Sequence, residues 1–167
     1  SAPIIRGILN KSGINTFDFS SYSGGLKRIG QIYQAITEIR KDAFLEPDAI
    51  LMHPSDWFDV VTETNAVTTS GALQPLFMGA GMFNGAPVAS MWGVPVVPTT
   101  AISAGTALVG AFGGGQAVHI VSRQGIEVSM SDSHDDFFTK DKVMMKASMR
   151  LGFPIYRASA FCSITNF

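Results

Sequence analysis

Charge is scarce in this sequence. Asp, Glu, Lys and Arg make up 15% of the 167 residues, whereas an average globular chain has roughly 25%. The formal net charge is −1, which excludes the basic field that recruits nucleic acid. A weakly charged surface commits less of its area to water, so this composition favours a protein that its partners partly cover.

Cysteine and long hydrophobic runs are also scarce. The single thiol, Cys162, excludes an intrachain disulfide and favours an intracellular, reducing setting. The most apolar stretch, 91–112, is interrupted by Pro95 and Pro98, which argues against a membrane-spanning helix. The first 13 residues lack the basic and apolar regions of a signal peptide. We therefore expect no contact with a membrane.

Apolar residues make up 46% of the chain, which is enough for a sizeable core. Between residues 26 and 43 the apolar positions fall at spacings of 3, 3, 1, 3 and 3, which predicts one face of a helix. A short apolar strand is predicted at 49–53. Pro54 in the first turn, or Ser55 as N-cap, then begins a helix over 54–64.

The remaining predicted elements are strands. A short strand is expected at 4–10 and a loop over 14–25. Further strands are expected at 93–98, 106–112, 117–123, 126–131 and 158–165, with a turn at Gln124–Gly125 and one long element at 142–151. Together with the helices, this pattern indicates a chain of mixed α and β structure.

Two groups of polar residues are candidates for chemistry. His53 and Asp56 lie at a predicted strand–helix junction, where hydrolase and metal sites occur. Asp56 has a structural interpretation as well, because a carboxylate stabilises a helix N-terminus. The cluster of Asp132, His134, Asp135 and Asp136 offers ligands for a divalent cation, but its spacing matches neither an EF-hand nor a zinc site. Turns at hairpin ends have the same composition, so we favour a turn or a subunit contact.

Other motifs point away from an active site. Gly113–Gly115 is followed by no Lys-Ser/Thr, so it is a poor phosphate loop. Cys162 lies in an apolar run and is expected to act as a core hydrophobe. The segment 65–90 is rich in Gly, Ala and Met, and it either covers a core or meets another chain. Its apolar candidates for a subunit interface are Leu76, Phe77, Met78, Met82 and Phe83.

Three stretches, taken in order, resemble a known family. They are AILMHPSDW (49–57), MWGVPVVPTTAISAGTALVGAF (91–112) and the segment 125–165, which closes with Arg-Leu-Gly and Ala-Phe. Their order is similar to that of the same landmarks in the major capsid proteins of tailed bacteriophages, with the Hong Kong 97-type fold that encapsulin shells share. The similarity extends over essentially the whole chain.

The resemblance implies an α+β fold with two parts. Residues 20–115 and 155–167 would form the axial domain, a sheet flanked by helices. Residues 1–19 and 116–154 would form part of the peripheral domain, with long antiparallel strands. Loop 65–90 would converge at the capsomer centre, and loop 131–136 would lie near three-fold contacts between capsomers.

The resemblance also implies a structural protein without enzymatic activity or cofactors. Copies of the chain would assemble in the bacterial host cytoplasm into pentamers and hexamers of an icosahedral virion capsid, of a phage or prophage. The partners would be other copies, with packaged DNA contacted only indirectly and no small-molecule substrate. Two alternatives stay open: an encapsulin-like compartment shell, and an enzyme that uses His53 and Asp56 or the 132–136 cluster.

The sequence departs from the family pattern in two respects. The N-terminal arm, extended hairpin loop and spine helix of the family are absent, so we expect the chain to correspond to the C-terminal half. Some members cross-link their subunits through a Lys, an Asn and a Glu. The positions that match the Asn and the Glu are Asp141 and Ser148 here, and we predict no autocatalytic isopeptide bond.

Overall fold

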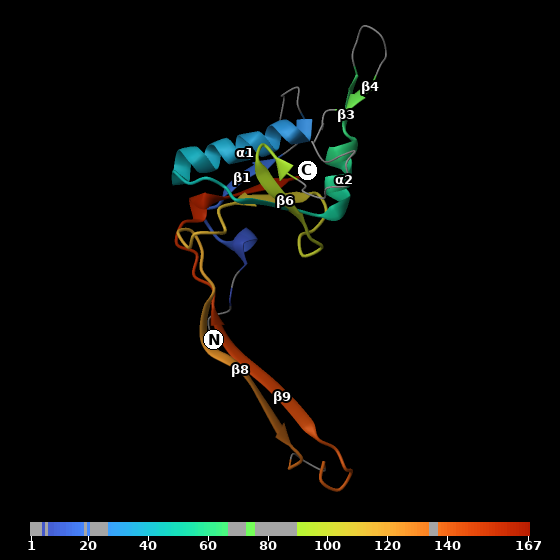
Figure 1. Ribbon diagram of the computed structural model, residues 1–167, viewed down its shortest axis with the longest axis vertical. Coiled ribbons are helices and arrows are strands. Elements are labelled where there is room, and N and C mark those ends of the chain that lie inside the picture. The colour runs from blue at the N-terminus through green and yellow to red at the C-terminus, as the bar shows by residue number, and fades with distance from the viewer. Residues whose placement is uncertain are drawn as a thin grey trace.

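A six-stranded sheet and two helices form a body, and two further strands extend from it as a long ribbon (Figure 1). The computed structural model describes residues 5, 7–18, 20, 27–66, 73–75, 90–133 and 137–167. Its helical elements are η1 (Ile8–Asn10), α1 (Lys27–Ala43), α2 (Pro54–Thr62) and η3 (Ala158–Ala160). Its strands are β1 (Asn15–Asp18), β2 (Ala49–Met52), β3 (Thr64–Ala66), β4 (Leu73–Pro75), β5 (Ser90–Met91), β6 (Val94–Pro98), β7 (Thr106–Gly110), β8 (Val121–Ser131), β9 (Met144–Gly152) and β10 (Phe161–Thr165).

The order of strands in the body sheet is β1-β10-β7-β2-β6-β5. β1 runs parallel to β10 and β2 runs parallel to β6, while the other neighbours are antiparallel. Two separate pairs, β3–β4 and β8–β9, are antiparallel. This arrangement confirms the expected α+β class.

Helix α1 supplies one half of the core. It packs on β10 and β7, and Ile32, Ile36 and Ile39 on its inner face are 0%, 1% and 0% exposed. Burying each such side chain fully is worth about 1.5–3 kcal/mol. The predicted helix over 26–43 is therefore confirmed, with its apolar face against the sheet.

The junction of β2 and α2 also follows the prediction, with one difference in detail. Pro54 occupies the first turn, as expected. The N-cap residue is His53 and not Ser55, because the imidazole Nδ1 of His53 accepts a hydrogen bond from the Ser55 N–H at 3.2 Å. A ring nitrogen thus takes the place of the hydroxyl oxygen that usually caps a helix.

The N-terminal segment differs from the prediction. Residues Ile8–Asn10 form a 3₁₀ helix in the stretch predicted as a strand, and β1 lies within the stretch predicted as a loop. Strand β1 depends on tertiary pairing with β10, supported by Asn166 Nδ2 donating to Asp18 Oδ1 at 3.0 Å. Local sequence preference in Asn-Thr-Phe-Asp is too weak to predict such an edge strand.

The ribbon differs from the prediction too. The two strands predicted at 117–123 and 126–131 are one strand, β8, and the long element at 142–151 is its partner β9. Gln124–Gly125 lies at a register shift between Ser122 and Glu127, so it is a bulge and not a turn. A bulge inserts extra residues while the ladder continues beyond it. Within the described residues, neither helix has the length and apolar character needed to cross a membrane.

The buried thiol gives a first prediction. Cys162 is 0% exposed, and burial, with a smaller contribution from the Glu38 carboxylate, raises its pKa to about 12. At pH 8 only about one thiol in 10,000 is then ionised. We expect 5,5′-dithiobis(2-nitrobenzoate) to leave the native protein unlabelled and to label it rapidly in urea.

A matched control for this labelling is Ser129→Cys, which places a thiol on the exposed ribbon. That thiol should react in the native protein at the rate of a small-molecule thiol. Native labelling of Cys162 at the same rate as the introduced thiol would contradict its placement in the core.

Candidate functional site

His53 and Asp56, the enzymatic candidates, are each engaged in a structural hydrogen bond. His53 Nδ1 contacts Ser55 at both its N–H and its Oγ, the latter at 2.6 Å. Asp56 is 5% exposed, and its Oδ2 accepts from the Gly105 N–H at 2.9 Å. Gly105 has φ +80°, and its carbonyl oxygen accepts from the Phe167 N–H at 3.0 Å. Asp56 thus holds the turn before β7 against α2.

The glycine run 113–115 is likewise part of the fold. The Asp48 carboxylate accepts from the Phe112 N–H at 2.7 Å through Oδ1 and from the Gly113 N–H through Oδ2. Gly114 and Gly115 have φ +69° and +66°, a conformation that costs glycine least. An acidic side chain already occupies the amides of Phe112 and Gly113, so these donors are not offered to a phosphate.

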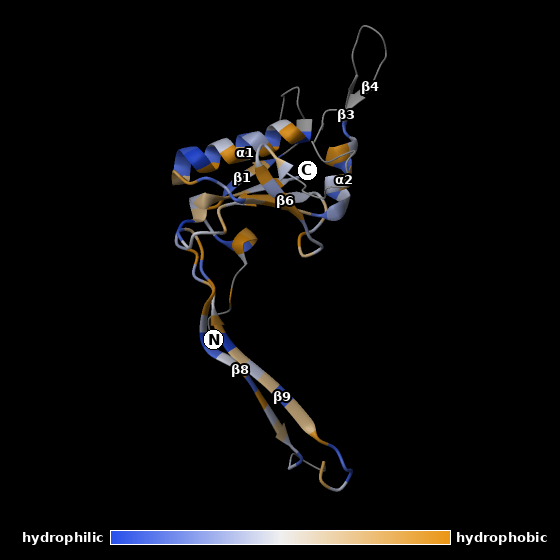
Figure 2. Ribbon diagram, viewed as in Figure 1, coloured by the Kyte–Doolittle hydropathy of each residue, from blue (hydrophilic) through white to orange (hydrophobic). Residues whose placement is uncertain are grey.

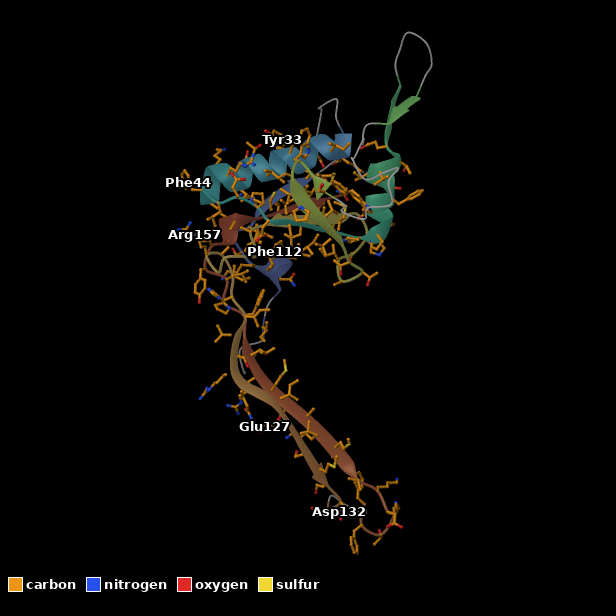
Figure 3. The ribbon with its side chains drawn as sticks, viewed as in Figure 1. Tyr33, Phe44, Phe112, Glu127, Asp132 and Arg157 are labelled. Carbon is orange, nitrogen blue, oxygen red and sulfur yellow. The ribbon has the colours of Figure 1, made fainter. Side chains whose placement is uncertain are left out.

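Asp132, the member of the predicted polar cluster that the structure describes, lies at the far end of the ribbon from the body (Figure 3). Asp132 is exposed just beyond β8, where Ser131 Oγ and Ser133 Oγ lie 2.9 Å apart. His134, Asp135 and Asp136 lie outside the described residues, as do the predicted interface residues Leu76, Phe77, Met78, Met82 and Phe83. In the part of the chain that the structure describes, no three His, Cys, Asp or Glu side chains are grouped closely enough to hold a metal.

The ribbon has one apolar and one more polar face. In its regular part Glu127 pairs with Ser148, Val128 with Ala147, and Met130 with Met145. Since side chains alternate between the two faces of a strand, this register sorts them. We define the apolar ribbon face by Ile126, Val128 and Met130 of β8 and Met145, Ala147, Met149 and Leu151 of β9. The opposite face carries Glu127, Ser129, Ser131, Met144, Lys146, Ser148 and Arg150.

The apolar ribbon face is exposed. Ile126, Val128 and Met130 are 72%, 60% and 66% exposed, and the apolar residues interleave with polar ones along both strands (Figure 2). An isolated two-stranded ribbon is only marginally stable in water. Contiguous exposed apolar surface on such an element marks a site of interaction.

A smaller exposed apolar contact lies on the body. The rings of Tyr33 on α1 and Trp92 in the β5–β6 turn have centroids 4.7 Å apart, and Trp92 Nε1 donates to the Ile29 carbonyl at 3.1 Å. Both rings remain about half exposed, at 45% and 48%. Half-exposed Tyr and Trp residues are frequent in protein interfaces.

Sequence reasoning missed both surfaces. The alternation of Ile126, Val128 and Met130 was available, and so was that of Met145, Ala147 and Met149. A turn predicted at Gln124–Gly125 splits β8 into two short strands, so the apolar ribbon face is not recognised as continuous. Tyr33 is one of the apolar positions whose spacing predicts the buried face of the helix, and no local pattern pairs it with Trp92 across 59 residues of sequence.

Comparison with known proteins agrees with this architecture. A model of the phage capsid family matches residues 4–166. The chain belongs to the phage capsid family. The major capsid protein of Enterobacteria phage HK97 is 30% identical over 155 residues, which are 90% of this chain and 37% of that protein.

Solved structures share the Hong Kong 97-type capsid fold of this chain. The Mycobacterium phage Ogopogo structure has a TM-score of 0.67 at 17% identity, covering 99% of this chain and 57% of that one. The encapsulin of Synechococcus elongatus PCC 7942 has a TM-score of 0.52 at 13% identity, covering 96% and 56%. The chain thus spans little more than half of each of these structures, and about a third of the HK97 protein.

The structure describes both positions that the resemblance aligns with the family's cross-linking residues. Asp141 lies in the turn that precedes β9 and has φ +47°. Ser148 lies within β9 and pairs with Glu127 of β8, whose side chain is labelled in Figure 3. The absence of an isopeptide cross-link in this capsid-family chain stays a prediction.

The buried carboxylate provides a test of the body. Replacing Asp56 by Ala leaves the Gly105 N–H without its charged acceptor, and a hydrogen bond to a charged group contributes about 1.5–3 kcal/mol. We expect the free energy of unfolding, measured by urea denaturation, to fall by about 2 kcal/mol.

The matched control is Asp59→Ala on the same helix. Asp59 is half exposed and lies 3.6 Å from Arg28 Nη2, and an exposed ion pair contributes about 0–1 kcal/mol. Equal losses from the two substitutions would contradict the structural role of Asp56.

Proposed function

We propose that this chain is a structural, non-enzymatic subunit of a tailed-phage capsid that assembles with other copies of itself. The single observation that carries the proposal is the apolar ribbon face, in a chain of the phage capsid family. A ribbon that exposes apolar side chains along its length has no folded partner within the described residues, and a lattice of copies supplies one. The setting that follows is the virion capsid, with assembly in the cytoplasm of the bacterial host.

The body and the ribbon correspond to the two domains that the resemblance implies. We assign the body to the axial domain and the ribbon to the peripheral domain. Strand β1 pairs with β10 in the body sheet, so we place Asn15–Asp18 in the axial domain and move the expected boundary at residue 19 toward the N-terminus. Loops 65–90 and 131–136 remain proposed contact regions at the capsomer centre and the three-fold positions.

Shell assembly needs only weak contacts. When one patch meets a different patch on its neighbour, the rotation between copies closes a ring. Each contact then acts together with many others, so the shell is stable although no single interface is large. The apolar ribbon face and the Tyr33–Trp92 pair lie on different parts of the chain, as ring-forming patches require.

Three alternatives from the sequence analysis differ in how well they are supported: an encapsulin-like shell, an enzyme and a cation site. An encapsulin-like shell uses the same fold, and its assembly surfaces would be the same, so the distinction concerns what the shell encloses. The enzyme alternative has little support, because His53 and Asp56 are committed to Ser55 and Gly105. The cation alternative for Asp132, His134, Asp135 and Asp136 stays a prediction.

The first test is self-assembly. Light scattering on a size-exclusion column should give a mass above that of one chain, which rises with protein concentration. Negative-stain images of the largest species should show rings of five or six copies, or shells. A single chain at every concentration would contradict self-assembly of this chain.

A second test separates the two faces of the ribbon. Val128→Glu places a charge on the apolar ribbon face, while Ser129→Glu places the same charge one residue away, opposite Lys146. Covering an unpaired charge in an apolar contact is costly, so Val128→Glu should lower the assembled fraction at least tenfold by light scattering. Ser129→Glu should assemble like the wild type.

Both substituted residues are exposed in the single chain. We therefore expect both variants to keep the far-ultraviolet circular dichroism of the wild type. Equal assembly of Val128→Glu and Ser129→Glu would contradict the role of the apolar ribbon face.

A further inference from the structure

Helix α2 is capped by a side chain that can change charge. The Nδ1 atom of His53 lies 3.2 Å from the Ser55 backbone nitrogen and 2.6 Å from Ser55 Oγ. The backbone N–H is a donor only, so Nδ1 must present its lone pair to it, and the ring proton then sits on Nε2. The cap therefore uses the neutral imidazole.

Protonation reverses the role of Nδ1. In the imidazolium both ring nitrogens are donors, so Nδ1 can still bind Ser55 Oγ but no longer accepts from the Ser55 N–H. The added positive charge also lies at the N-terminal end of α2, where the helix dipole is positive. Both effects weaken the first turn of the helix.

The charged groups near His53 are few. On α2 itself they are Asp56, whose carboxylate is bonded to the Gly105 N–H, and Asp59, which lies 3.6 Å from Arg28 Nη2 of α1. Glu63 follows the last turn, at the other end of the helix. β2, β6 and β7 carry no charged residue, and the sequence contains none from Thr64 to Val118. Among the described residues of these elements, Asp56 in the first turn is the charged group that opposes the loss of the cap.

We propose that His53 is a pH-dependent cap, which holds α2 while its imidazole is neutral and releases the first turn of the helix when the imidazole is protonated. The helix leads directly into β3, and the β3–β4 pair projects at the end of the body away from the ribbon (Figure 1). Loosening α2 loosens the attachment of the β3–β4 pair to the body. Any effect of this loosening on the assembly of copies rests on the proposed function, whereas the cap itself does not.

Hydrogen–deuterium exchange of the segment 54–62 tests the cap, with the variant His53→Asn as the reference. Asn is a strong N-cap that does not titrate. Comparing wild type and variant at the same pH cancels the pH dependence of intrinsic exchange. At about pH 8 the two should exchange alike, and at about pH 5.5, within the range where His gains its charge, the wild type should exchange roughly five- to tenfold faster.

Two further variants complete the design. His53→Ala should exchange faster than His53→Asn at both pH values, and the segment 161–165 in β10 reports whether each variant is folded. His119→Asn, on the exposed segment before β8, should behave like the wild type. If the Ala variant does not fold, the comparison of wild type with His53→Asn decides alone.

The overturning results are equally specific. The proposal fails if wild type and His53→Asn exchange alike at both pH values, or if His119→Asn removes the pH dependence. Assembly plays no part in this readout, so a failed cap leaves the proposed function standing. Conversely, a chain that does not assemble can still show the cap.

Discussion

The antiparallel pairing of β10 with β7 is the interaction on which both parts of the molecule depend. Strand β7 is the last strand before the chain leaves the body for the ribbon, and β10 is the strand with which it returns. Phe161 lies opposite Gly110, where a side chain on Gly110 would overlap the Phe161 ring. The Phe112 ring packs against the same side chain with centroids 5.3 Å apart. This contact fixes both ends of the ribbon at one point of the sheet.

The ribbon is joined to the body at one end, and its two strands alone cannot bury their apolar side chains in a core. Between the body and the ribbon, the Ala117 carbonyl accepts from the Tyr156 N–H at 2.9 Å, and the Pro154 carbonyl accepts from the His119 N–H at 3.2 Å. Beyond these bonds, the main partner of each ribbon strand among the described residues is the other strand. Covering one exposed Val, Met or Ile side chain is worth up to about 1.5–3 kcal/mol, so a neighbouring chain that covers a few of them stabilises the ribbon and the lattice together. On the proposed function, folding of the ribbon and assembly of the shell are then one process.

How far the sequence predicts this structure depends on where each element gets its stability. Helix α1 is predictable because Ile32, Ile36 and Ile39 repeat with the helical period and face one sheet. Strand β1 is not predictable, since its place is set by β10, which follows it by more than a hundred residues. The bulge at Gln124–Gly125 has the local chemistry of a turn, and only the long partner strand β9 makes it part of one ladder.

The candidate site also combines features that the sequence predicts with features that depend on tertiary contacts. His53 and Asp56 attract attention as a pair at a strand–helix junction, but the hydrogen bonds to Ser55 and Gly105 that define their roles depend on three-dimensional placement. The apolar ribbon face was present as alternation in the sequence and became visible once the register of β8 and β9 was known. The contact residues expected in the segment 65–90 lie outside the described residues, so their part in assembly rests on the resemblance.

The central claim is that contacts between chains stabilise the ribbon. Limited trypsin digestion followed by mass spectrometry measures this directly, because Lys146 and Arg150 lie within β9. The account predicts rapid cleavage at both residues in dilute, dissociated protein and strong protection in assembled particles. Cleavage after Arg40, at the C-terminal end of α1 in the body, should change little between the two states. Equal rates of ribbon cleavage in dissociated and assembled protein would contradict the account.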